Sequence, residues 1–96
     1  MAWKLLQISS GHLSLENDKL RSEQIFEVLS EIERNLAASP EFGGKLGITP
    51  AAAAAELLVD GVRITVGWDL WSGVFIMARD DKGDNIIQNT IYPIFL

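Results

Sequence analysis

The chain has 96 residues, of which 48% are apolar and 22% are charged, and its formal net charge is −5. This length suits a single domain, and this composition is typical of globular proteins rather than of disordered chains. The absence of cysteine excludes disulfides, thiolate zinc sites and cysteine nucleophiles. We therefore expect one domain over residues 1–96.

The charge and hydropathy of the chain also limit its partners and location. An acidic surface repels phosphate backbones, so nucleic-acid binding is disfavoured. The acidic balance suits either a basic protein partner or simply good solubility, and solubility is the more common reason. No stretch reaches the roughly 18 apolar residues that span a bilayer, and the first residues lack the long apolar region of a secretory signal. We expect a cytoplasmic protein that does not bind a membrane.

Two short β-strands are expected at the start of the chain. Residues 3–8 (WKLLQI) are rich in apolar side chains and end at a turn of serines and a glycine, and residues 13–16 alternate between apolar and polar. His12 lies in the turn between these strands, so we expect its ring to face solvent.

Residues 22–38 carry the clearest helical pattern. Ile25, Leu29, Ile32 and Leu36 follow one another at helical spacing, so they form one apolar stripe, which Phe26 and Val28 are expected to widen. Pro40 ends the helix, because the residue before a proline is pushed out of helical geometry. A helix of about four turns is not stable alone in water, so the stripe is expected to pack on a sheet.

The middle of the chain allows two interpretations. Residues 40–49 have three glycines and a proline and are expected to form a loop. The run of alanines after Pro50 indicates a short helix, whereas Asp60-Gly61 between β-formers indicates a hairpin turn. We expect a helix over residues 50–56 that gives way to a strand near Leu57.

The second half of the chain predicts a meander of three strands. Residues 62–66 and 74–78 are the strongest β-formers, residues 67–73 are expected to connect them as a loop, and residues 79–85 form a polar turn before a last strand over 86–91. The predicted fold is α+β: an antiparallel sheet of four to five strands, one long helix packed on one face, and a short Ala-rich helix.

The loop between the two central strands is the candidate site. Trp68, Asp69, Trp71 and Ser72 are crowded between two glycines, and tryptophan is over-represented where proteins bind partners. The alternative is that both indoles seal the end of the core while Asp69 caps a turn. We take the four residues as a predicted partner-binding site.

The polar turn after the last central strand resembles a calcium loop only in composition. Asp80, Asp81, Asp84 and Asn85 supply oxygens, but an EF-hand loop beginning at Asp80 would need glycine at its sixth position and glutamate at its twelfth. Those positions hold Asn85 and Ile91. We expect these residues to be solvated turn residues without a metal.

Catalytic signatures are also incomplete. His12 has no serine or carboxylate at a spacing that indicates a catalytic pair, and Gly43-Gly44-Lys45 lacks the glycine spacing of a phosphate loop. The sequence therefore favours a protein without enzymatic activity or cofactor.

The apolar C-terminal tail over residues 91–96 has two open interpretations. It either completes the core or provides an edge strand through which a homodimer forms. The favoured function is a non-enzymatic protein-binding module, such as an inhibitor or immunity-type protein, that contacts a basic partner through the Trp-rich loop and an acidic surface. The alternative is a homo-oligomeric domain that binds a small molecule between sheet and helix.

Overall fold

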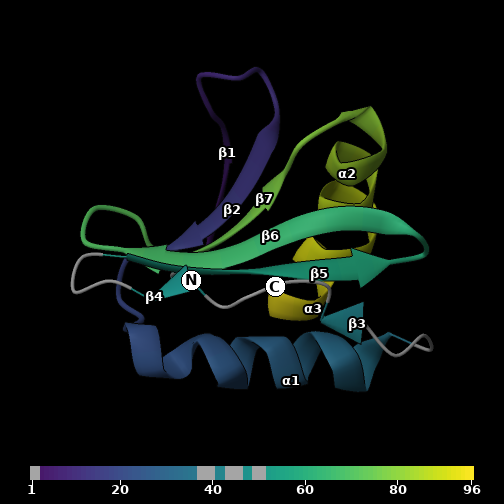
Figure 1. Cartoon of the computed structure of the whole chain (residues 1–96). Coiled ribbons are helices and arrows are strands. Elements are labelled where there is room, and N and C mark those ends of the chain that lie inside the picture. The colour runs from purple at the N-terminus through teal and green to yellow at the C-terminus, as the bar shows by residue number, and fades with distance from the viewer. Residues whose placement is uncertain (1–2, 37–40, 43–46, 49–51) are drawn as a thin grey trace.

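The chain forms an antiparallel sheet with helices, so the α+β class predicted from the sequence is confirmed. The computed structural model describes residues 3–36, 41–42, 47–48 and 52–96 (Figure 1). In this part of the chain the sheet has seven strands in the order β1-β2-β7-β6-β5-β3, and β4 also pairs with β5. The strands are β1 (Lys4–Gln7), β2 (Leu13–Asn17), β3 (Glu41–Phe42), β4 (Gly47–Ile48), β5 (Ala52–Val59), β6 (Val62–Asp69) and β7 (Gly73–Ala78).

Four of the predicted strands are found close to their expected places, as β1, β2, β6 and β7. The expected loop over residues 40–49 is partly wrong, because its residues 41–42 and 47–48 are short strands that pair with β5. The other residues of that stretch lie outside the described part of the chain.

Residues 52–55 of the alanine run belong to strand β5, so the Ala-rich helix predicted over residues 50–56 is wrong, although residues 50 and 51 lie outside the described part of the chain. β5 pairs with β6 along its whole length, from Ala52 opposite Asp69 to Val59 opposite Val62. Alternate residues of β5, Ala55, Leu57 and Val59, are buried in the core. Helix propensity favours alanine by only a few tenths of a kcal/mol per residue, roughly, over most residues, and burial of two large side chains outweighs it.

The predicted hairpin turn after β5 is confirmed. Asp60 and Gly61 both have positive φ angles, 50° and 78°, as a type I′ turn requires. This turn fixes the register in which Leu57 lies opposite Ile64, so the apolar residues of both strands share one face.

The loop expected over residues 67–73 is shorter than predicted. β6 continues to Asp69 and β7 begins at Gly73, which lies opposite Asp69 in the register. Only residues 70–72 connect the two strands. The candidate binding residues therefore lie at the end of a hairpin and not in a long loop.

Helix α1 (Ile25–Asn35) follows a 3₁₀ turn at Ser22–Gln24 and ends near the predicted position. Its buried side chains are Val28 and three residues of the predicted stripe, Ile25, Leu29 and Ile32, while Leu36 follows the helix as its C-cap and is partly buried. They belong to one apolar cluster with core-facing residues of the sheet. The expectation that Phe26 widens the stripe is wrong, because Phe26 is 61% exposed. Residues 37 and 38 of the predicted helix lie outside the described residues.

The C-terminal segment is helical from Asp81, so the strand predicted over residues 86–91 is wrong and the polar turn predicted over residues 79–85 is shorter than expected. It consists of α2 (Asp81–Ile86), the π-helical segment η2 (Ile87–Ile91) and α3 (Tyr92–Phe95). Asp80 begins it, because its Oδ1 accepts the backbone N–H of Gly83 at 2.7 Å. Ile87 and Ile91 lie at helical spacing and are fully buried.

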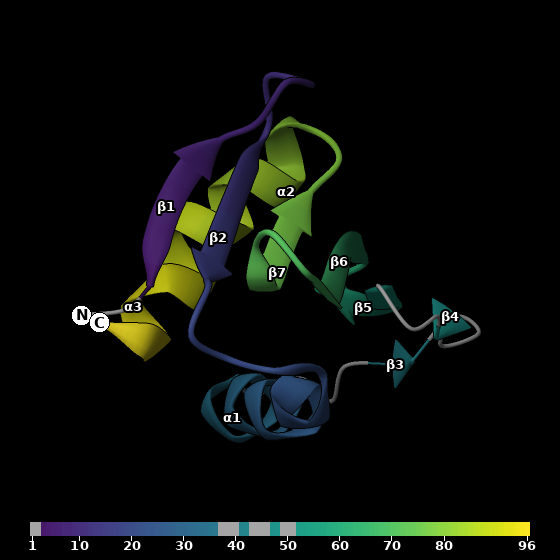
Figure 2. The ribbon, with the colours of Figure 1, turned by 90° about the vertical axis from the view of Figure 1, so that its left-hand side faces the viewer.

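The C-terminal tail contributes to packing and does not form an edge strand. The ring of Phe95 in α3 lies 4.6 Å, centroid to centroid, from the indole of Trp3 beside β1, and Figure 2 shows α3 next to β1. The C-terminal strand edge expected from the sequence is therefore wrong, since this segment is helical and offers no unpaired ladder groups. None of the described helices is long and apolar enough to cross a membrane.

Alternation along the strands separates a core-facing side of the sheet from an outer side. Leu15, Ile76, Val66 and Leu57 lie on the core-facing side and are buried. The residues between them point the other way. The outer side carries, among others, Lys4, Leu6, Glu16, Phe75, Met77, Thr65 and Glu56.

Candidate functional site

The end of the β6–β7 hairpin is held by the side chain of Asp69. Its Oδ1 accepts the backbone N–H of Trp71 at 2.9 Å and that of Ser72 at 2.6 Å, the arrangement by which aspartate stabilises a tight turn. The residue Trp71 nevertheless remains largely in contact with solvent, at 82% exposure. The backbone is thus fixed while the indole stays free to make contacts.

Gly73 brings this hairpin end against strand β2. Its φ angle is +69°, and a Cβ atom at this position would lie 2.1 Å from the carbonyl oxygen of Asn17 and 2.6 Å from the Cα atom of Asp18. Only a residue without a Cβ atom permits so close an approach. The hairpin end therefore lies directly beside the end of β2.

This approach creates a hollow on the outer side of the sheet. The hollow has a volume of ≈ 110 Å³ and is open to solvent. It is lined by Lys4, Leu6, Glu16, Asp18, Trp71 and Ser72. Two carboxylates and one ammonium give these lining residues a net charge of −1.

The second indole of the predicted site lies elsewhere. Trp68 shares the core-facing side of β6 with Ile64 and Val66, and it packs against the buried apolar cluster. The structure thus brings Asp69, Trp71 and Ser72 together at the hairpin end and separates Trp68 from them. Lys4, Leu6, Glu16 and Asp18 were not predicted from the sequence, because no local signal places the first strand beside the hairpin.

The opposite end of the outer side carries an ion-pair group. Glu56 on β5 lies 2.9 Å from the guanidinium of Arg79 and 3.8 Å from that of Arg63. The Glu56–Arg79 pair crosses β6, which lies between β5 and β7. Thr65 on β6 is buried, and its hydroxyl and that of Ser14 make no hydrogen bond in the described part of the chain.

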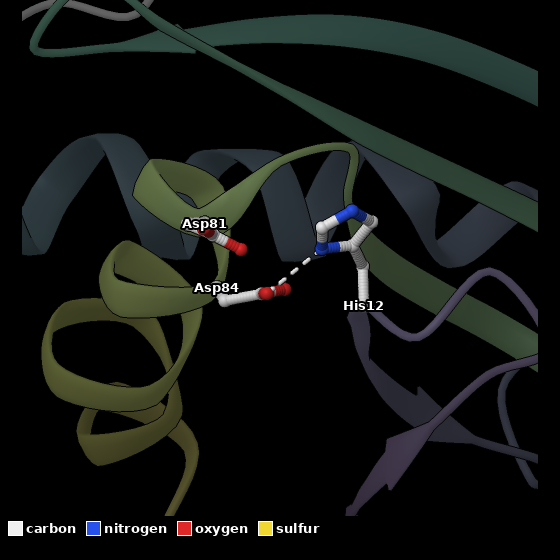
Figure 3. Close-up of side chains that lie close together, drawn as sticks. All are labelled: His12, Asp81 and Asp84. Atoms are coloured by element: carbon white, nitrogen blue, oxygen red, sulfur yellow. Dashed lines mark hydrogen bonds and ion pairs between the residues drawn. The ribbon is translucent and has the colours of Figure 1, made fainter.

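His12 takes part in a hydrogen-bonded contact between the β1–β2 turn and α2 (Figure 3), which we call the polar tie and which consists of His12, Leu13 and Asp84. Its Nδ1 lies 2.8 Å from Oδ2 of Asp84, and Oδ1 of Asp84 accepts the backbone N–H of Leu13 at 2.7 Å. The expectation that Asp84 is a solvated turn residue is wrong, and the His12 side chain, expected to face solvent, is only partly exposed, at 25%. The two residues are 72 positions apart, so no spacing in the sequence signals the contact.

The tie shifts the pKa values of both partners. The hydrogen bond to Asp84 raises the pKa of His12 above 6.5, and the negative charges of Asp84, Asp81 and Asp80 act in the same direction. The hydrogen bonds from His12 and from the N–H of Leu13 lower the pKa of Asp84. Both shifts favour a charged histidine beside a charged aspartate.

Asp81 completes a group of three possible metal donors with His12 and Asp84. One ligand atom of each lies within 4.8 Å of the others, but Asp81 is exposed and both oxygens of Asp84 already accept hydrogen bonds. Three donors also fall short of the six to eight oxygens of calcium sites. The hydrogen bonds that join the β1–β2 turn to α2 through Asp84 account for the closeness of these side chains.

Comparisons with known proteins give no relative for the chain. No protein-family model matches it, and neither a curated protein nor a solved structure matches it. Function must therefore be argued from the hairpin end and its hollow.

Proposed function

We propose that the protein is a non-enzymatic binding module that contacts a protein partner through the end of the β6–β7 hairpin. The supporting observation is that Trp71 is 82% exposed on a turn whose backbone Asp69 holds in place. A held backbone lowers the entropy lost on binding. Tryptophans in such positions are enriched among the residues that dominate binding energy.

The size of the indole gives a scale for the contact. A tryptophan side chain buries about 150–250 Å², and burial of that area corresponds to about 4–6 kcal/mol at about 25 cal/mol per Å². Part of this free energy offsets the entropy of association. One indole can thus dominate a small interface without being sufficient alone.

The partner in this proposal is a basic protein. The chain has a net charge of −5, Glu16 and Asp18 line the same hollow as Trp71, and Asp69 accepts the backbone N–H of Trp71. Opposite charges speed encounter and favour the correct orientation. An inhibitor or immunity-type protein of the cytoplasm would use such a surface to block a basic target.

The fold suits this role in one further respect. In our proposal the long helix α1 packs across the core-facing side of the sheet, where its stripe shares the apolar cluster of β5, β6 and β7. The outer side and the hairpin end then stay available for a partner. Trp68, predicted as a contact residue, would anchor the hairpin to the core.

The test is capture of partners from an extract of the native host by the immobilised protein, compared with two variants. Trp71→Ala should lose a stoichiometric basic partner, whereas Phe26→Ala should keep it, because Phe26 is an exposed aromatic side chain that lies on α1 and not at the hairpin end. Thermal denaturation must show that both variants are folded. Equal capture by Trp71→Ala and wild type would refute the proposal.

A further inference from the structure

We infer that the hollow beside Trp71 binds one arginine side chain of the partner. This inference rests on the proposed function, because it names the group that the hairpin end would recognise. The lining residues bring together an exposed indole, an apolar side chain and two carboxylates: Trp71, Leu6, Glu16 and Asp18. These are the three kinds of group that a guanidinium on an aliphatic stem requires.

The indole and Leu6 suit the flat and apolar parts of arginine. A guanidinium stacks on the face of an aromatic ring, and tryptophan is the best aromatic partner for a cation. Leu6 is 42% exposed on the outer side of β1, where it can contact the methylene stem. Lysine fits less well, because its ammonium is more strongly hydrated and does not stack.

The carboxylates suit the charge and the hydrogen-bond donors of arginine. Glu16 lies on the outer side of β2 opposite Phe75 of β7, and Asp18 follows the end of β2 at the point where Gly73 approaches. A guanidinium presents its N–H groups as a planar fork that matches carboxylate oxygens. Both carboxylates line the hollow that Trp71 borders.

Lys4 is the cation that an arginine would have to compete with. It lies directly opposite Glu16 in the register of β1 and β2, and it lines the same hollow. Yet no ion pair in the described part of the chain joins Lys4 to Glu16 or Asp18. The Lys4 ammonium would repel an arginine bound in the same hollow, so removal of the Lys4 charge should strengthen the binding of arginine.

The direct test uses two small probes and the full-length protein. N-acetyl-arginine amide should shift the indole N–H signal of Trp71 in a saturable manner in a ¹H–¹⁵N NMR titration over a millimolar range. N-acetyl-citrulline amide has almost the same shape without the charge, so it should leave the signal in place. Equal shifts with both probes, or none with arginine amide, would overturn the inference.

Variants of the residues that line the hollow should change the affinity for N-acetyl-arginine amide in both directions. Lys4→Gln should tighten arginine-amide binding about threefold, and Glu16→Gln combined with Asp18→Asn should weaken it about fivefold, the scale of exposed charge pairs. Lys82→Gln on α2 is the control, because it removes the same charge from an element that does not line the hollow. If Lys82→Gln changed arginine-amide binding as much as Lys4→Gln does, binding would depend only on net charge. That result would contradict recognition of arginine by the residues that line the hollow.

The inference and the proposed function fail in different ways. If Trp71→Ala retains the native partner, the proposed function is wrong. If Trp71→Ala loses the partner while the titration does not distinguish arginine amide from citrulline amide, the hairpin binds a partner but the hollow does not recognise arginine.

Discussion

Substitution of Gly73 by alanine tests the contact that builds the hollow. The native φ angle of +69° is one that side chains rarely adopt, and the new Cβ atom would lie 2.1 Å from the backbone oxygen of Asn17. Gly61→Ala is the matched control, because its φ angle is +78° but nothing lies within 4 Å of its Cβ position. The pair thus separates the conformational cost from the clash.

The expected magnitudes follow from these two contributions. Positive φ costs a side-chain-bearing residue about 1–2 kcal/mol, so Gly61→Ala should lower the free energy of unfolding by about that amount. Gly73→Ala carries the same cost and adds about 1–3 kcal/mol for overpacking against backbone that cannot rotate away. The total of about 2–5 kcal/mol is a large share of the about 5–15 kcal/mol typical of a small domain.

Urea denaturation followed by circular dichroism measures both variants at the same pH and temperature. Gly73→Ala should also alter the NMR signals of Asp18 and Trp71, since the hairpin end must move away from β2. If Gly73→Ala destabilises the protein no more than Gly61→Ala does, the hairpin end does not lie against β2. The hollow described here would then not exist in solution.

Three further predictions concern the core, a buried hydroxyl and the polar tie. Ile32→Ala should lower the free energy of unfolding by about 2–5 kcal/mol, because Ile32 is fully buried. Phe26→Ala should change the free energy of unfolding by less than about 0.5 kcal/mol. Similar losses for the two variants in urea denaturation would show that the buried face of α1 is not the one described. Thr65→Val should raise the free energy of unfolding by about 1 kcal/mol, because it removes a buried hydroxyl that lacks a partner, and a clear loss in the same assay would reveal a hidden hydrogen bond. The raised pKa of His12 means that its ionic contribution is fully present below its usual value of 6.5 and is lost as pH rises through the raised value, while the lowered pKa of Asp84 removes the contribution again in strong acid. The stability difference between wild type and His12→Gln should therefore shrink between pH 6 and pH 9, and a difference that grows over this range would contradict the tie.

The sequence predicted those parts of the fold in which local pattern and tertiary packing agree. The stripe of Ile25, Leu29 and Ile32 and the positive-φ turn at Asp60 and Gly61 are both found in the structure. The alternation of apolar and polar residues also predicted β6, but the predicted strand ended at Val66, whereas β6 continues to Asp69. Continued by one step, the same alternation places Trp68 on the core-facing side with Val66, so the separation of the two indoles was open to prediction.

The remaining differences depend on contacts between distant parts of the chain. β5 is a strand because β6 pairs with it along its length, although its alanines favour helix when considered alone. The C-terminal segment is helical because Asp80 caps it and because Ile87 and Ile91 fall at helical spacing, a pattern that the β-branched composition concealed. The hollow and the His12–Asp84 tie join residues from both ends of the chain, so no local pattern could reveal them.

The most direct measurement of the central claim is site-specific photo-crosslinking from the hairpin end in cells of the native host. A photo-reactive residue in place of Leu70, which is exposed next to Trp71, leaves the indole intact. We predict one discrete adduct with a basic protein, lost when Trp71→Ala is added and kept when Phe26→Ala is added. An adduct that persists without the Trp71 indole, or no adduct at all, would contradict the account of the hairpin end as the partner-binding surface.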